Sequence, residues 1–384
     1  MLMSRTIQIS TYFFYVVLFI LPFVYFPEVF NSYELPKFIF LGSSILLLGT
    51  VVLFREVGIK NLRIRLNKID ILVMVFLLIL LVSDIFGVYV KNSFLGSSYR
   101  LQGFLTYLIF GYGYMIVRIL SMQAKIKIYN VLFVQLALLS ILLIGQYLLV
   151  STFGESISLF QNRYHGTFGN PNFAGGYMVM LFAYILFVKG NMHKVYWFKP
   201  LVILLCGIAI ILTDSRSAIL AVVITTVLYY FNIIKKMQGW VRIAFVIAIC
   251  AISYSFIFLT IDQSLLEKRN SEWENRSIIW KEGATLFMNK PFLGYGQENV
   301  QVIFPANLHF SVDNMHNIFL EYAVSSGIVG LVSFVILSLL SFIKSDRGRK
   351  MLFLSFFVTA FFNPLSIAQL FLFWVFLGIQ NNQD

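Results

Sequence analysis

Residues 262–317 read DQSLLEKRNSEWENRSIIWKEGATLFMNKPFLGYGQENVQVIFPANLHFSVDNMHN and form the only long polar interruption in an otherwise apolar sequence. The segment runs directly into an apolar stretch that begins near Ile318. A loop of this length is usually functional or disordered, and its aromatic residues and one helical pattern argue against disorder. We therefore predict that residues 262–316 form a long loop that covers a functional site and contributes residues to it.

The rest of the chain has the composition of a membrane protein. The 384 residues are 59% hydrophobic and 12% charged, with a mean hydropathy of +0.84, whereas a soluble domain is about half apolar and about a quarter charged. Apolar runs long enough to cross a bilayer recur along the chain. They predict an all-α polytopic membrane protein, one domain over residues 1–384, with about twelve transmembrane helices. The predicted spans are 11–27, 38–54, 69–90, 103–119, 128–150, 172–188, 197–213, 217–234, 243–261, 317–343, 351–363 and 366–380.

The basic residues predict the orientation of these spans. Most of the 29 Lys and Arg residues fall in alternate connecting segments, as the positive-inside rule expects of cytoplasmic loops. Both termini are then cytoplasmic, and the 262–316 loop is extracytoplasmic. Basic residues in cytoplasmic loops explain the net charge of +12. We therefore predict contact with membrane lipids and no nucleic-acid partner.

Two short polar turns divide long apolar stretches near the membrane boundary. Residues 213–217 separate the spans 197–213 and 217–234, and Asn363-Pro364 separates the last two. In the long loop, Ile279, Leu286 and Phe287 follow the helical spacing i, i+7 and i+8. This pattern predicts an interfacial helix over residues 276–289 that ends before Pro291.

Several chemical classes lack support in the sequence. There is no Walker A or Rossmann glycine motif and no G-x-S-x-G elbow, and the four histidines lack the spacing of metal ligands. We therefore expect no cofactor and no metal site. The predicted outer loops carry arginines, one well-placed histidine, carboxylates and aromatic residues, which suits an anionic, sugar-bearing substrate.

Arg216 and Arg276 are the candidate residues for binding a diphosphate. Arg216 stands at the predicted outer end of two apolar helices, where an arginine either pairs with a neighbour such as Asp214 or reaches water. Arg276 lies beside Glu272 and Glu274, as on an ordinary solvated helix face. Directed at one place, however, the two guanidinium groups would offer forked donors to a diphosphate.

His316 is the candidate catalytic residue, because it precedes an apolar helix at the outer membrane boundary. A histidine is the usual general base for activating a hydroxyl at neutral pH. The alternative is an incidental histidine in a helix-capping segment. Lys37, Arg100 and Arg163 are further candidates for binding an anionic headgroup. Trp273, Trp280, Phe304 and Phe310 could stack on sugar rings, although aromatic residues are also expected at a membrane interface without such a role.

Six stretches in the order of the chain resemble the O-antigen ligase and O-antigen polymerase superfamily of bacterial membrane glycosyltransferases. They are YELPKF at 33–38, LGSSYRLQGFLTYL at 95–108, GTFGNPNFAGGYM at 166–178, LTDSRSAIL at 212–220, NRSIIWKEGATLFMNKPFLGYG at 275–296 and MHNIFLEYAVSSGIVGL at 315–331. The resemblance implies a fold like that of the type C membrane glycosyltransferases and a place in the bacterial cytoplasmic (inner) membrane. It also implies transfer of a glycan from a polyprenyl diphosphate carrier to an acceptor hydroxyl, with inversion and without a metal.

The resemblance also implies roles for particular residues. The two phosphate-binding arginines of the family match Arg216 and Arg276, its essential histidine matches His316, and Arg100 matches another family arginine. This chain departs from the pattern at Asp214, where the family commonly has a small residue. The implied partners are a polyprenyl-diphosphate-linked glycan as donor and a glycan, lipid or wall polymer as acceptor. Ligases and polymerases share these motifs.

Two other functions stay open from the sequence. One is a flippase or transporter for the same lipid-linked glycan, although transporters place substrate groups on interrupted helices near the midplane. The other is a membrane glycosyltransferase whose base is a carboxylate of the first outer loop, Glu28 or Glu34. In that enzyme the carboxylate, and not His316, would be indispensable.

Overall fold

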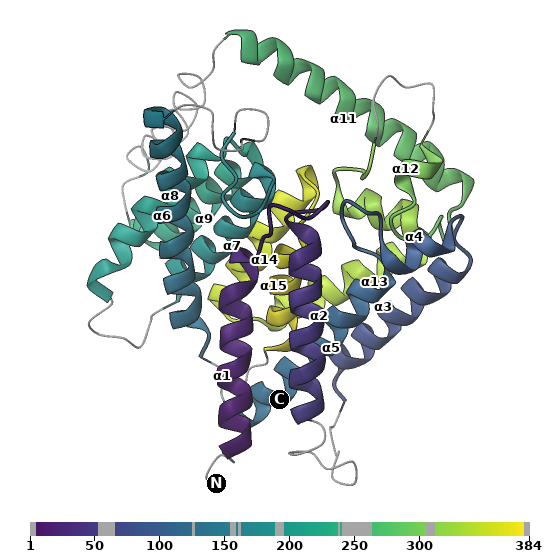
Figure 1. Ribbon diagram of the computed structural model, residues 1–384, viewed down its shortest axis with the longest axis horizontal. Coiled ribbons are helices and arrows are strands. Elements are labelled where there is room, and N and C mark those ends of the chain that lie inside the picture. Colours follow the sequence, from purple (N-terminus) through teal and green to yellow (C-terminus); the bar gives the residue numbers. More distant parts are fainter. Residues whose placement is uncertain are drawn as a thin grey trace.

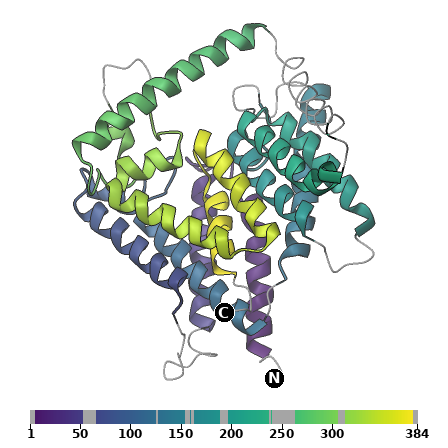
Figure 2. The same cartoon turned by 180° about the vertical axis from the view of Figure 1, so that it is seen from behind.

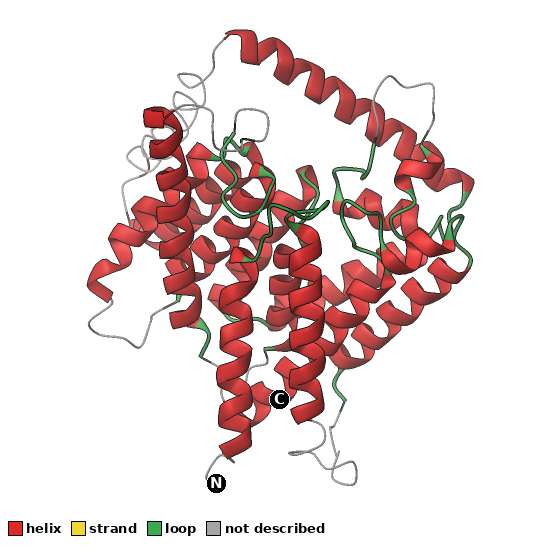
Figure 3. Cartoon of the chain, in the orientation of Figure 1, coloured by secondary structure: helices red, strands yellow, loops and turns green. Residues whose placement is uncertain are grey.

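The computed structural model describes residues 5–52, 66–124, 127–153, 159, 163–188, 196–236, 239, 263–304 and 312–379. Within them the chain forms helices joined by loops (Figure 3). The predicted span 243–261 lies outside the described residues, and each of the other predicted spans coincides with a helix. These helices are α1 (Arg5–Ile20), α2 (Glu34–Val51), α3 (Lys68–Ile85), α5 (Phe104–Ala124), α6 (Tyr129–Phe153), α7 (Pro171–Phe187), α8 (Lys199–Leu212), α9 (Arg216–Lys236), α13 (Ile318–Lys344), α14 (Arg347–Phe362) and α15 (Ile367–Gly378).

The length and composition of the helices confirm a multi-pass all-α membrane protein. Among the described residues, four helices are long and apolar enough to cross a membrane, namely α2, α5, α6 and α13. Several shorter apolar helices, including α1, α7, α8, α9 and α15, accompany them. The number of twelve spans therefore stays a prediction.

Helices α7 and α15 form the centre of the bundle. Every residue of α15 is buried, and so are nearly all those of α7. Helix α7 packs against α6, α8, α9 and α14, while α15 packs against α2 and α5. Figure 1 and Figure 2 show the two from opposite sides, with the other helices around them.

Polar side chains at the helix starts explain two of the sequence motifs. The Asn170 side chain accepts a hydrogen bond from the Asn172 N–H at the start of α7, where Pro171 occupies the first helical position. Asn317 caps α13 in the same way, by accepting from the N–H groups of Phe319 and Leu320. A cap satisfies backbone donors that have no partner inside the helix. Both helices therefore begin at a defined residue beside a polar loop.

The helix of the long loop is longer than predicted. Helix α11 (Gln263–Asn289) begins before residue 276 and ends before Pro291, as the sequence predicts. It crosses the end of the bundle opposite the start of α1 (Figure 1). Its apolar residues Ile279, Leu286 and Phe287 pack in a second hydrophobic cluster with Met315. The apolar stripe predicted to face the membrane interface thus contacts protein.

A break in α13 receives the loop that follows α11. Gly327 has φ +65° inside α13, and the helix kinks there. The N–H groups of Tyr295 and Gly296 donate to the carbonyl oxygens of Val324 and Ser325 at 3.0 and 2.8 Å. The loop thus satisfies carbonyls that the kink removes from the helical ladder. The motifs at residues 275–296 and 315–331 meet at this contact, which fixes the long loop on the membrane helices.

We expect Gly327→Ala to destabilise the folded protein by roughly 3 kcal/mol. A Cβ at residue 327 would lie 2.1 Å from the Phe292 carbonyl oxygen, and the positive φ is itself unfavourable for alanine. Thermal unfolding of the detergent-solubilised protein measures the change. Gly207→Ala in α8 is the matched control, because a Cβ there meets nothing within 4 Å. Equal unfolding temperatures for the two variants would contradict this account of the kink.

Candidate functional site

The backbone holds His316 in a strained conformation directly before the cap of α13. His316 has φ +52°, in the left-handed region that residues other than glycine rarely adopt. Its N–H donates to the Asn314 side-chain oxygen at 2.8 Å. Strain of this kind persists only where surrounding contacts determine the conformation, and it is often found at functional sites.

The residue before His316 is held from two sides. The Met315 N–H donates to a carboxylate oxygen of Glu321 in the first turn of α13, at 2.9 Å. The Met315 carbonyl accepts from the indole Nε1–H of Trp280 on α11, at 3.0 Å. The Met315 side chain is fully buried. The His316 segment is therefore attached to both α11 and α13.

The surroundings of His316 keep its imidazole neutral. Burial lowers the pKa of His316 to about 4; the Asp313 carboxylate opposes this shift, and the guanidinium groups of Arg276 and Arg100 add to it. Nδ1 of His316 is buried and has no hydrogen-bond partner among the described residues. The ring is thus uncharged at neutral pH and able to accept a proton.

Asn363, in the turn between α14 and α15, connects helix α9, which begins with Arg216, to helix α11, which carries Arg276. Nη2 of Arg276 donates to the Asn363 side-chain oxygen at 3.4 Å, and the Asn363 side-chain amide donates to the Ser217 hydroxyl. Ser217 follows Arg216, the exposed first residue of α9. The structure therefore links the start of α9 and the end of α14 to Arg276, which lies close enough to His316 to lower its pKa.

Arg163 holds the turn between α8 and α9. Its guanidinium group donates to the carbonyl oxygens of Thr213 and Asp214 at 3.1 and 2.9 Å. It also donates to the Asn172 side chain at 3.1 Å, near the start of α7. Asp214 has φ +50°, so this turn too has an unusual backbone. The contacts give Arg163 a part in presenting Arg216, and its contact with a headgroup stays a prediction.

Lys37 is buried and joins the start of α2 to the segment before α7. Its Nζ donates to the carbonyl oxygens of Tyr33 and Thr167 at 3.1 and 2.9 Å. The ammonium group also lies 5.5 Å from the centre of the Phe168 ring. These interactions compensate the burial of a charge. A headgroup contact of Lys37 likewise stays a prediction.

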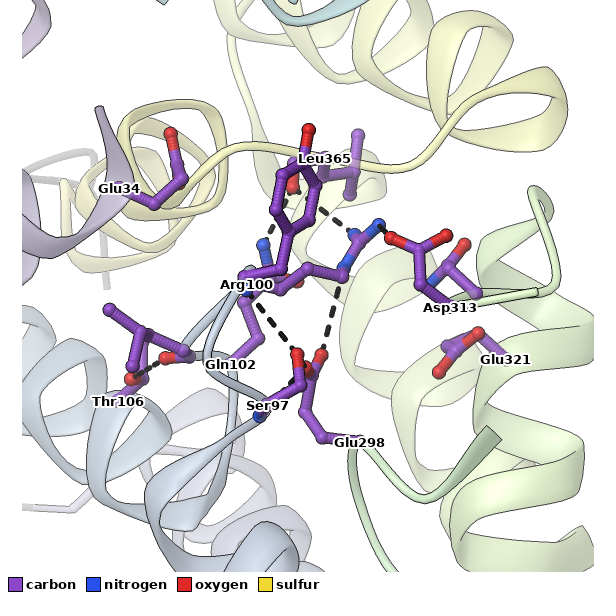
Figure 4. Close-up of polar contacts among 12 residues, drawn as sticks. Glu34, Ser97, Arg100, Gln102, Thr106, Glu298, Asp313, Glu321 and Leu365 are labelled. Atoms are coloured by element: carbon purple, nitrogen blue, oxygen red, sulfur yellow. Dashed lines mark hydrogen bonds and ion pairs between the residues drawn. The ribbon is translucent and has the colours of Figure 1, made fainter. Parts of the chain in front are cut away.

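Arg100 lies at the centre of a buried polar network (Figure 4). It is 2% exposed; Nε lies 3.7 Å from Glu298 and Nη1 lies 3.6 Å from Asp313. The Leu365 carbonyl accepts from Arg100 and from the Gln102 side chain. Burial raises the pKa of Glu298, and the nearby Arg100 opposes that shift. A buried guanidinium group requires such partners, and here they tie three segments between helices to the turn before α15.

A pocket adjoins these residues, with about 310 Å³ of space free of protein atoms, part of it open to solvent. Polar side chains of Arg100, Glu321, Asn314 and Asn363 line it, and the last two contact His316 and Arg276. The complete lining is Arg100, Gln102, Tyr107, Asn314, Ile318, Glu321, Tyr322, Asn363, Pro364, Leu365 and Leu370. His316, Arg276 and Arg216 are not among these lining residues; the pocket adjoins His316 through Asn314 and Arg276 through Asn363.

Sequence reasoning missed two kinds of residue in this site. Asn363 was recognised only as part of a turn, and Glu298 and Glu321 were not singled out, although all three are polar residues beside apolar or glycine-rich stretches. Within the described residues, no group of three or more His, Cys, Asp or Glu side chains could hold a metal ion. Metal independence itself stays a prediction.

Comparisons with known proteins agree with the motifs. A family model described as O-antigen ligase matches residues 201–335, which run from α8 into α13 and include Arg216, Arg276 and His316. The ComP-specific O-oligosaccharyltransferase of Acinetobacter baylyi (strain ATCC 33305 / BD413 / ADP1) is 28% identical over 228 residues. That match covers 54% of this chain and spans 41% of the relative.

Proposed function

We propose that this chain, which matches the O-antigen ligase family model over residues 201–335, is a member of the O-antigen ligase superfamily and transfers or polymerises a glycan from a polyprenyl diphosphate carrier onto an acceptor hydroxyl. The reaction takes place at the outer face of the bacterial cytoplasmic membrane. The observation that carries this proposal is the neutral, strained His316 beside a polar pocket, with Arg276 near it. The asymmetric distribution of basic residues supports the outer face, with both termini in the cytoplasm.

In the proposed reaction, Arg216 and Arg276 bind the diphosphate and His316 acts as general base. The acceptor oxygen attacks the anomeric carbon while its proton passes to His316. The bond between that carbon and the phosphate oxygen breaks, and its electron pair leaves with the diphosphate. The two guanidinium groups stabilise the charge that develops there. Attack from the face opposite the leaving group inverts the anomeric centre.

Donor binding would also strengthen the base. The positive charges of Arg276 and Arg100 lower the pKa of His316 in the free protein. A bound diphosphate would compensate the charge of Arg276, so the pKa of His316 would rise when the donor is present. The histidine is then neutral before the donor arrives and a better proton acceptor afterwards.

We expect kcat/KM for transfer to stay nearly constant between pH 7.5 and pH 5.5. This ratio reports the free enzyme, in which a His316 pKa of about 4 leaves the imidazole neutral over the whole range. Protonation of the His316 ring should lower activity only as the pH approaches that pKa. A histidine with the ordinary pKa of 6.5 would retain about one tenth of its neutral form at pH 5.5, and a tenfold loss of kcat/KM there would contradict the buried site. Enzyme returned from pH 5.5 to pH 7.5 controls for inactivation.

Reconstitution tests the proposed function directly. The purified protein in liposomes, supplied with a polyprenyl-diphosphate-linked glycan and a hydroxyl acceptor, should form the transferred product with inverted anomeric configuration. The product should also form in the presence of a metal chelator. A matched donor carried on a polyprenyl monophosphate should react poorly, because it offers one phosphate fewer to the two arginines. Absence of product with every hydroxyl acceptor class, namely glycan, lipid and wall polymer, would overturn the proposal.

A further inference from the structure

Three residues on one face of α11, in successive turns of the helix, lie against the candidate site. Arg276, Trp280 and Gly283 are spaced i, i+4 and i+7, which places them on the same side of a helix. Arg276 bonds to Asn363. Trp280 bonds to the carbonyl of Met315. A Cβ on Gly283 would lie 2.9 Å from the Met315 sulfur, so the helix approaches this residue closely.

Trp280 uses both parts of its indole for contacts within the protein. The N–H donates to the Met315 carbonyl, and the ring packs edge-on against Phe361 of α14, with ring centres 5.8 Å apart. Phe361 lies two residues before Asn363, the residue that receives Arg276. Trp280 thus connects α11, α14 and the His316 segment, and these contacts disfavour its use as an open stacking platform for a sugar.

We propose that Trp280 is a positioning residue that couples the diphosphate-binding Arg276 to the base His316. The proposal rests on the proposed function and extends it. Because Trp280 lies one helical turn from Arg276 and holds the carbonyl directly before His316, it fixes how the base stands relative to the leaving group. Glu321 holds the other side of Met315, and together the two contacts maintain the strained conformation of His316.

The test is Trp280→Phe, which removes the N–H donor and keeps an aromatic ring. We expect kcat to fall about 10- to 100-fold, since a displacement of about 1 Å at a reacting group has costs of that order. KM for the donor should change less than about twofold, because Arg276 and Arg216 are intact. Trp197→Phe is the matched control; Trp197 is 87% exposed and should give wild-type kinetics. An unchanged kcat in Trp280→Phe would overturn the proposal, and so would a loss confined to KM.

A double variant separates positioning from a general structural effect. If Trp280 acts through His316, Trp280→Phe should not lower further the residual rate of a His316→Asn variant. An additional 10-fold loss in the double variant would mean that Trp280 acts independently and would contradict the coupling.

A chemical measurement that does not depend on glycan transfer tests the positioning role of Trp280 separately from the proposed function. Carbethoxylation by diethyl pyrocarbonate, followed by peptide mass spectrometry, reports access to the His316 ring. In Trp280→Phe we expect this reaction to be about fivefold faster, the factor for local opening when one ordinary hydrogen bond is lost. The buried His165 serves as internal reference. An unchanged His316 rate would overturn the positioning role even if transfer fell, whereas loss of the proposed function alone would leave the faster reaction in place.

Discussion

His316→Asn should reduce glycan transfer about 1,000-fold while the protein remains in the membrane at its normal abundance. Asparagine tolerates the left-handed conformation that residue 316 adopts, but it cannot accept the acceptor's proton. A positioned general base contributes roughly 100- to 10,000-fold to a rate, which sets the expected loss. Product formation by the purified variant, at saturating donor and acceptor, measures it.

The competing assignment places the base on a carboxylate of the first outer loop. Glu34 needs a conservative substitution, because its carboxylate accepts the Ile367 N–H at 2.7 Å at the start of α15. Glu34→Gln keeps an acceptor at that position and removes the base, and Glu28→Gln does the same at an exposed position. Full transfer by His316→Asn together with inactive Glu28→Gln or Glu34→Gln would replace the histidine mechanism.

Arg276→Lys and Arg216→Lys should each lower transfer about 100-fold. Lysine keeps the charge but loses the planar fork that binds two phosphate oxygens together, and removal of one donor to a developing oxyanion costs on the order of 100- to 1,000-fold in kcat. For Arg276 the substitution also loses a fixed geometry, since its Nη2 is directed to Asn363. Initial rates at saturating donor measure the effect.

Lys281→Ala is the control for these variants. Lys281 is an exposed residue of the same helix, one position beyond Trp280, and its removal should leave transfer unchanged. If both lysine variants at Arg216 and Arg276 kept nearly normal rates, the two arginines would be ordinary charges at the membrane boundary.

The sequence predicted the helices better than their contacts. Apolar length was enough to place α13 and the two short turns at residues 213–217 and 363–364, because each is a local change from apolar to polar residues. The start of α11 was misplaced, since residues 263–275 are polar and show no apolar stripe. The kink at Gly327 could not be predicted either, because its cause is a loop some thirty residues earlier in the chain.

The partners of the charged residues in the site could not be predicted from the sequence either. Arg100, Lys37 and Arg163 hold partners far away in the sequence, such as Glu298 and Thr167, and their contact with an anionic headgroup stays a prediction. Residue type and local spacing do not reveal such partners. Arg276 and His316 were predicted together only because the family motifs carry both. Asn363, which links Arg276 to α9, belongs to a turn that gave no functional signal.

The location of the lipid-linked glycan in cells that carry His316→Asn tests the central claim most directly. An enzyme that acts at the outer face and lacks its base should leave the donor stranded in the outer leaflet. Susceptibility of the glycan to an impermeant glycosidase or lectin in intact spheroplasts distinguishes the two leaflets, with lysed spheroplasts giving the total. The account predicts accumulation of accessible donor at the outer face. Accumulation at the inner face would contradict it and identify the protein as a flippase.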